Sequence, residues 1–326
     1  MNQLTSFDQA EKIVDRFRDL LHRYNINPPV HSVIENELLA PYEVLLRSKS
    51  PSSIAERSNL LAEAAGMFDL AAKLLSIETH PEFATFVPHL TLFGSAHPLA
   101  STIQTTPGQP TDDVHRKLAE LYLGSLAVNV GHNVELDHPS NSRGDNPDVL
   151  FDFIREAGEK KRWALAIKTI STRNGQTIFE RIGEAGRQIN TLSCPADRGL
   201  VVVNAQGSID HQALWGKTFT NVTEAKTELS NQIGELWDSA NANRCPSDWT
   251  DILKDRVSPV VLFMGHAYVR VSTPFSQNTP TLLKVLMSWN PTKTNDDEAA
   301  SICVGLNHFM HLIQEGIPGT ANSFPK

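Results

Sequence analysis

Asp148 and Lys168 are the residues of this 326-residue chain whose types and spacing are best suited to chemistry. Residues 163–170, WALAIKTI, have the composition of a buried strand, and Lys168 is the one charged residue among them. A buried ammonium is costly without an anionic partner, and Asp148, which follows Pro147 in the preceding strand-like run, is the nearest candidate. We therefore expect a carboxylate, which is an oxygen ligand for hard cations, and an ammonium on neighbouring strands.

Other acids could join this pair. Glu180, Glu184 and Gln188 are spaced by four residues and so share one face of an expected helix over 177–192. Helical angles slightly favour Glu184 over Glu180, because Glu184 lies closer to the apolar stripe, although Glu180 is closer to Lys168 along the chain. Glu135, on an earlier strand-like run, is a further donor. A solvated helix face remains the alternative for the three helical residues.

The elements that must position these residues follow from hydrophobic periodicity. Asp112 can cap a helix that ends near Gly131, with Leu118, Leu121 and Leu126 facing inward. The pattern then predicts strands over 132–137, 148–153 and 163–170, the helix over 177–192, and a buried strand over 199–205. The expected order is helix, three strands, helix, strand. An edge strand whose lysine reaches water is the alternative without chemistry.

This order, with these residues on it, resembles the PD-(D/E)XK nuclease superfamily over residues 111–210. Pro147 and Asp148 match the start of its motif, and Lys168 matches the motif lysine. Gln188 resembles the glutamine often found on the second helix, and Glu120 falls where many members carry a supporting acid. The resemblance implies an α/β fold, a central mixed sheet flanked by helices with a restriction endonuclease-like core.

The resemblance also implies a function, a metal-binding and DNA-binding nuclease that hydrolyses phosphodiesters. Asp148 would bind Mg²⁺ or Mn²⁺ together with the main-chain carbonyl of Ile167, and Lys168 would orient or help to deprotonate the attacking water. We expect the substrate to be DNA in preference to RNA. A hard cation suits this reaction, because it neutralises developing negative charge and lowers the pKa of bound water.

One position departs from the family pattern. The second motif acid should lie two residues before the lysine, where this chain has Ala166. Glu184 or Glu135 would then have to replace the missing metal ligand, and Gln188 would complete the catalytic set with Asp148 and Lys168. The alternative function is a nuclease-like fold that no longer cuts and acts as a binding or regulatory module.

Around this core we expect four parts. Residues 1–90 read as a helical domain with capping boxes at Ser6 and Ser53, and 91–110 as a connector, with strand-like pieces around Phe86 and 90–93. The α/β core spans 111–271, with a helical insertion after 211 and a strand or hairpin over 257–271, and 272–326 forms a C-terminal helical segment with helices over 281–288 and 296–315. The N-terminal helices could bind a second copy or a protein partner.

Composition limits the function classes. The net charge of −8 disfavours bulk attraction to nucleic acid, so a local patch such as Arg155, Lys160, Lys161 and Arg162 would have to bind it, unless these residues are a solvated hairpin tip. No apolar run reaches the length of a membrane span and no secretory signal is present, so we expect a cytoplasmic protein without a membrane partner. His308 and His311 share a helix face but lack further ligands of recognised spacing.

Overall fold

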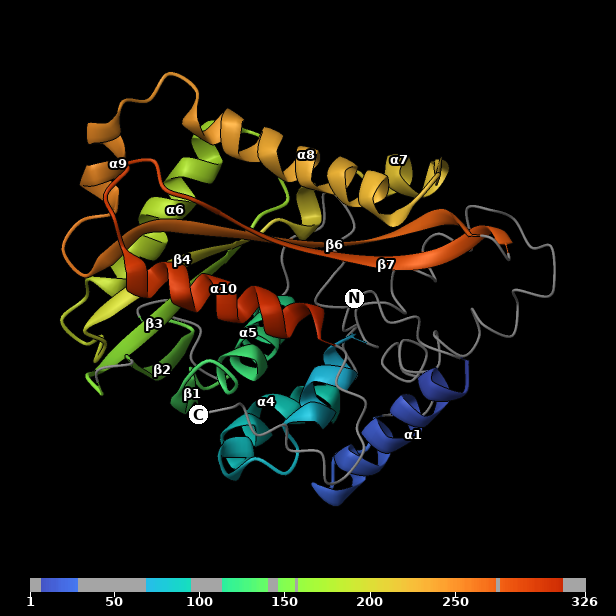
Figure 1. Ribbon diagram of the computed structural model, residues 1–326. Helices are drawn as coiled ribbons and strands as arrows, with labels where there is room; N and C mark the ends of the chain where they lie inside the picture. The colour runs from blue at the N-terminus through green and yellow to red at the C-terminus, as the bar shows by residue number, and fades with distance from the viewer. Residues whose placement is uncertain are drawn as a thin grey trace.

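The computed structural model describes residues 7–28, 69–94, 113–139, 146–155, 158–273 and 276–312. Their strands form a seven-stranded mixed sheet in the order β1-β2-β3-β4-β6-β5, and β7 pairs with β6. Helices cover both faces of this sheet (Figure 1). The predicted α/β class, with a central mixed sheet flanked by helices, is confirmed.

The part of the fold that carries Asp148 and Lys168 has the predicted element order. Its elements are α5 (Asp113–Ala127), β1 (His132–Leu136), β2 (Val149–Ile154), β3 (Lys160–Thr169), α6 (Gly175–Ile189) and β4 (Arg198–Asn204). Strands β1, β2 and β3 are antiparallel neighbours, whereas β4 lies parallel to β3. A parallel pair needs a crossover connection, which α6 provides.

The alternation of β3 divides the core into two layers. Trp163, Leu165 and Ile167 pack on the face covered by α5 and α10 (Asp297–His311). Ala164 and Ala166 pack on the opposite face, under α6 and α8 (Val222–Asn241). Because a strand buried on both faces reads as a continuous apolar run, the charged Lys168 is the exception that the sequence singles out.

The described N-terminal helices share a hydrophobic core with the sheet. They comprise α1 (Phe7–Arg23), helical residues 69–76, η1 (Pro81–Phe86), α4 (Val87–Leu90) and η2 (Thr91–Gly94). Phe17, Phe86 and Phe93 belong to one buried cluster with the α5-facing residues of β3. Buried apolar residues of these described helices therefore pack in the core of the sheet, and the partner contact expected from the sequence stays a prediction.

Two secondary-structure predictions are wrong. The strand-like pieces around Phe86 and 90–93 are helical turns, since Pro81 and Pro88 occupy first-turn positions, where proline is tolerated. Residues 281–288, expected as a helix, belong to β7 (Ser276–Trp289), because a strand with apolar residues on both faces resembles a short buried helix. Ser6, Ser53 and most of the 91–110 connector lie outside the described residues.

Strand β6 (Val257–Thr273) and helices α8 and α10 lie where the sequence predicts a strand and helices. The other described elements are η3 (Gln206–Ser208), α7 (His211–Gly216), β5 (Thr218–Phe219) and α9 (Pro246–Ile252), of which β5 is a strand within the expected helical insertion. The expected strand or hairpin over 257–271 is the first arm of the long β6–β7 hairpin, along which α8 runs (Figure 1). Neither arm contributes a residue to the site around Asp148.

Candidate functional site

Asp148 lies at a bend one residue before β2 and is buried. Its main-chain N–H donates to the carbonyl of Leu165 at 3.0 Å, and its carboxylate Oδ2 accepts from the main-chain N–H of Ile167 at 2.5 Å. Both contacts are to β3. The sheet therefore fixes the backbone and the side chain of Asp148 at the end of β2.

A second carboxylate, Glu120 of α5, is fully buried and hydrogen bonds to Asp148. Burial, followed by the charge of Glu120, raises the pKa of Asp148 to about 8, against the opposing effects of the Ile167 N–H and the Lys168 charge. Two carboxyl groups in contact cannot both ionise cheaply in such a place. The pair therefore retains a proton near neutral pH unless a cation is bound.

Lys168 is the second-to-last residue of β3 and is half-buried. Its charge lowers the pKa of Asp148, so the ammonium is within electrostatic range of the carboxylate. The alternation of β3 places Lys168 on the face of Ala164 and Ala166, while Asp148, outside the regular strand, also contacts α5. Residues 148 and 168, chosen from the sequence, thus lie near each other at one end of the sheet.

Three further residues, which the sequence did not single out, surround Glu120. Lys117 donates to Glu120 Oε2 at 2.8 Å and to Asp137 Oδ2 at 3.1 Å, and His89 Nε2 lies 3.4 Å from the same Glu120 oxygen. Burial, followed by the charge of Lys117, lowers the pKa of His89 to about 3, so this imidazole is neutral. The three-residue spacing of Lys117 and Glu120 on one helix, and the place of Asp137 directly after a strand, were the available signals.

The acids expected from α6 lie elsewhere. Glu184, with a side chain 37% exposed, pairs with Arg181 at 2.7 Å, and the exposed Glu180 accepts from Gln176 at 2.7 Å. Both carboxylates therefore belong to the solvated face of α6, the alternative considered for this stripe. Glu184 is not brought to Asp148 as a metal ligand.

Gln188 is buried, but at the opposite end of β3 from Lys168. Its neighbour Ile189 packs against Gly199, which pairs with Ala164. Ala164 is four residues before Lys168, a distance of roughly 13 Å along a strand. Because α6 returns antiparallel to β3, residues late in the helix move away from the end that carries Lys168, so the catalytic role expected for Gln188 is not supported.

Glu135 also lies apart from Asp148. Its side chain is 63% exposed and accepts from Arg162 at 2.8 Å. Together with Asn133 and Asp152 it lines a surface hollow of about 490 Å³. The expectation that Glu135 replaces the missing acid is therefore not supported, because Glu135 pairs with Arg162 and lines the hollow beside Asp152.

The donor set around Asp148 fits one small hard cation. Within the described ranges, no three His, Cys, Asp or Glu side chains are arranged to enclose a metal ion by themselves. Mg²⁺ needs only one or two carboxylates because it keeps several waters. Asp148 and Glu120 supply these, and the carbonyl of Ile167 faces the same strand edge as the Ile167 N–H that binds Asp148. Ala166 of β3 is fully buried and its side chain offers no ligand.

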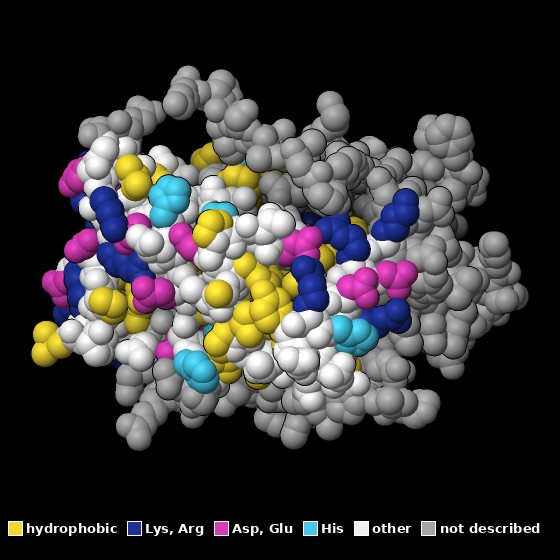
Figure 2. All heavy atoms as spheres, turned by 90° about the horizontal axis from the view of Figure 1, so that it is seen from below, with side chains coloured by type: hydrophobic (Ala, Val, Ile, Leu, Met, Phe, Trp, Pro, Cys, Tyr) yellow, Lys and Arg dark blue, Asp and Glu magenta, His cyan; other side chains and the backbone are white. Residues whose placement is uncertain are grey.

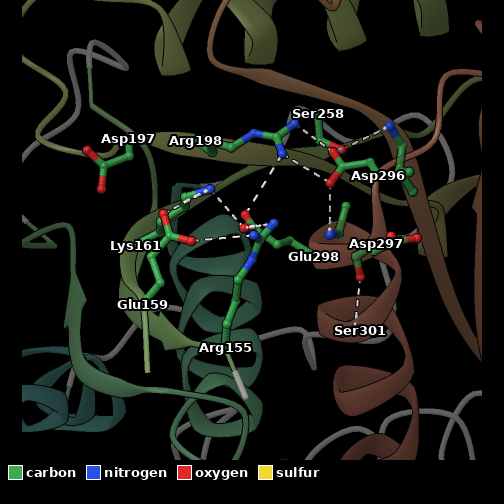
Figure 3. A network of polar contacts seen from close by, with 12 residues as sticks. Arg155, Glu159, Lys161, Asp197, Arg198, Ser258, Asp296, Asp297, Glu298 and Ser301 are labelled. Carbon is green, nitrogen blue, oxygen red and sulfur yellow. Dashed lines mark hydrogen bonds and ion pairs between the residues drawn. The ribbon is translucent and has the colours of Figure 1, made fainter. Parts of the chain in front are cut away.

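The basic hairpin between β2 and β3 is neutralised by acids. Lys161 binds Glu298 at 2.8 Å, and Arg155 pairs with the same carboxylate (Figure 3). Lys160 binds Asp152 at 2.6 Å. On the face that Figure 2 shows, cationic and acidic side chains are interspersed around a central hydrophobic area. The local basic patch expected at Arg155, Lys160, Lys161 and Arg162 is therefore an ion-pair network, which weakens its predicted role in binding a phosphate backbone.

Comparisons with known proteins found no match to this chain among protein-family models, curated proteins or solved structures. None of the helices in the described part of the chain has the length and apolar character needed to cross a bilayer. The functional conclusion therefore depends on the geometry around Asp148.

Proposed function

We propose that this chain is a metal-dependent nuclease of the PD-(D/E)XK type, which hydrolyses phosphodiester bonds of DNA in preference to RNA. The observation that carries the proposal is the buried Asp148–Glu120 carboxylate pair, with the Lys168 ammonium within electrostatic range of Asp148. The order α5-β1-β2-β3-α6-β4, with its antiparallel and parallel pairs, supports it further. Glu120, in place of Glu184 or Glu135, would supply the acid that Ala166 lacks.

Each residue has a role that its surroundings favour. Asp148, Glu120 and the Ile167 carbonyl would hold Mg²⁺ or Mn²⁺, which would neutralise charge on the phosphodiester and activate a water. Lys168, half-buried and within range of Asp148, would donate a hydrogen bond to the attacking water or to a phosphate oxygen. His89 and Lys117 would hold the Glu120 carboxylate in its orientation through Oε2.

Cleavage assays test this function. Labelled single-stranded and duplex DNA and RNA are incubated with the full chain and Mg²⁺ or Mn²⁺. We expect metal-dependent cutting that falls on the order of 10²–10⁴-fold in Lys168→Met, the range for loss of a group that assists proton transfer, and that is lost in Asp148→Asn. Glu184→Gln, on the solvated face of α6, is the matched control and should cut like the wild type. Equal cutting by Asp148→Asn would contradict the proposal.

A second function, a nuclease-like fold that binds without cutting, is favoured by two observations. Ala166 is fully buried where the family has an acid, and the hairpin cations are bound to Asp152 and Glu298. If the wild type cuts no nucleic acid and folded Ala166→Glu gains Mg²⁺-dependent cleavage, this second function replaces the first. Circular dichroism must show that the variant folds, because a glutamate at a buried position is costly.

A further inference from the structure

The ammonium of Lys117 lies between two carboxylates beside the Glu120–Asp148 pair. Its Nζ is 2.8 Å from Glu120 Oε2, 3.1 Å from Asp137 Oδ2 and 3.5 Å from the Asp137 carbonyl. The Lys117 side chain is 2% exposed and that of Glu120 is 0% exposed, so neither is a surface group held by chance. An ammonium has three donors, and three acceptors lie within reach here.

Main-chain contacts fix this arrangement next to Asp148. Lys117 and Glu120 are three residues apart on α5 and so project from one side of the helix. Asp137, directly after β1, donates its main-chain N–H to the carbonyl of Asp148 at 3.0 Å. Glu120, Asp137 and Asp148 are therefore neighbours, with Lys117 between the first two.

Three carboxylates are enough in number to serve two metal ions, but the Lys117 ammonium lies between two of them. Hydrolases with two metal ions hold them roughly 3.5–4 Å apart between several carboxylates. Here no three such ligands among the described residues enclose an ion, and the gap between Glu120 and Asp137 contains the Lys117 ammonium. Once a bound cation has displaced the proton that Asp148 and Glu120 share, the three carboxylates and the ammonium groups of Lys117 and Lys168 sum to −1, so that one divalent ion makes the site +1 and a second would make it +3.

We infer that the Lys117 ammonium occupies the position of a second divalent ion in this site. The chain therefore binds one ion, at Glu120 and Asp148, and not two. This inference rests on the metal binding within the proposed function but not on cleavage. Lys117 acts as a positioning residue through Glu120 and Asp137. A lysine cannot exchange like a metal ion, so the stoichiometry is set by the fold.

Counting bound Mn²⁺ tests the inference. The full chain is titrated with Mn²⁺ and bound ions are counted by electron paramagnetic resonance, which also separates an isolated ion from a spin-coupled pair. We expect one isolated ion per chain in the wild type and in Lys217→Met, a control that removes a surface pair with Glu228. Lys117→Met, similar in size but uncharged, should bind two coupled ions. One ion in folded Lys117→Met would overturn the inference.

A second variant keeps the test decisive if Lys117→Met does not fold. Asp137→Asn retains the Lys117–Glu120 contact and should still bind one ion, whereas loss of Mn²⁺ would make Asp137 a ligand and overturn the inference, as would two ions in the wild type. One bound ion without cleavage would remove the nuclease proposal and leave the inference standing. Cleavage with two bound ions would leave the nuclease proposal standing and overturn the inference. If the wild type bound no ion, both the inference and the proposed metal site would be overturned.

Discussion

His266 of β6 is buried among charged groups on the α5 face of the sheet, away from Asp148. Its Nε2 lies 3.2 Å from the Tyr122 hydroxyl and 3.7 Å from Asp69 Oδ2. Burial lowers the pKa of His266 to about 3, although the charge of Asp69 opposes this shift. The other charged or titratable groups that act on it are Lys284, His311 and Lys73. The imidazole is therefore neutral at physiological pH, and its protonation in acid destabilises the folded state.

This environment predicts an acid-sensitive contribution to stability. The unfolded chain binds a proton at His266 near pH 6.5, the folded chain only near pH 3, so the free energy of unfolding should fall as pH decreases through this window. The slope from one such group is about 1.4 kcal/mol per pH unit. His266→Gln should remove that slope in urea unfolding between pH 4 and 6, while His308→Gln, exposed on α10, should not. An unchanged slope in His266→Gln would contradict the assignment.

At the residue scale, the sequence predicted which charged side chains lie on neighbouring strands. Asp148 and Lys168 could be singled out because a lysine in an apolar, buried strand needs an anion nearby. Lys117 could not, since a lysine in an amphipathic helix normally reaches water and its burial here depends on Asp137 from a later element. Gln188, which the sequence groups with Glu180 and Glu184 on one helix face, is buried in α6, and the helix alone does not reveal which end of β3 it covers.

At the scale of elements, Asp296 fixes the start of α10. Its carboxylate caps the helix by accepting from the Ala299 N–H at 3.2 Å, and it also accepts from Arg198 at 2.7 Å and Ser258 at 2.7 Å (Figure 3). We expect Asp296→Ala to lower the free energy of unfolding by about 2–4 kcal/mol, since both the cap and the ion pair are lost.

Asn provides the matched comparison at this position, because it retains capping ability without the charge. Asp296→Asn should therefore unfold at a higher urea concentration than Asp296→Ala, with a difference of about 1 kcal/mol. Exposed Asp297→Asn should change the stability by less than about 0.5 kcal/mol. Equal losses in the Asn and Ala variants would show that the side chain does not cap α10.

Two helix-interior glycines predict opposite effects of the same substitution. A Cβ at Gly186 of α6 would collide with the main-chain carbonyl of Ile252, whereas a Cβ at Gly234 of α8 would have no heavy atom within 4 Å. Gly234→Ala should stabilise the protein by roughly 0.5–1 kcal/mol through helix propensity. Gly186→Ala should destabilise it by about 1–3 kcal/mol, because backbone must shift. Thermal unfolding compares them, and stabilisation by Gly186→Ala would refute the close approach of α6 and α9.

The order of elements around the site followed from periodicity, whereas β7 and the N-terminal boundary did not. In β7, Leu283 and Val285 face one core layer and Leu286 faces the other, with the charged Lys284 among them, and apolar residues on both faces are also typical of a short buried helix. The sequence also contains no sign that the first helices would join the core of the sheet, because an amphipathic helix shows that it has a buried face but not what covers it.

At the scale of the whole molecule, the shared core implies that the chain unfolds as one unit. The five tryptophans lie at positions 163, 215, 237, 249 and 289, all outside the N-terminal helices, so their fluorescence reports on the α/β part alone. Phe17 of α1 is fully buried and its ring lies 5.3 Å from that of Phe93.

Phe17→Ala changes a residue of α1, and it should therefore also destabilise the α/β part of the molecule, where the tryptophans lie. Removing a buried phenylalanine costs about 3–5 kcal/mol, and in a cooperative fold the whole loss appears in every probe. We expect the urea midpoints of tryptophan fluorescence and far-ultraviolet circular dichroism to fall together, while Arg18→Ala, on the exposed face of α1, leaves both within about 0.5 kcal/mol of the wild type. If only the dichroism changed and the fluorescence transition stayed in place, the helices would unfold as an independent domain, which would contradict the shared core.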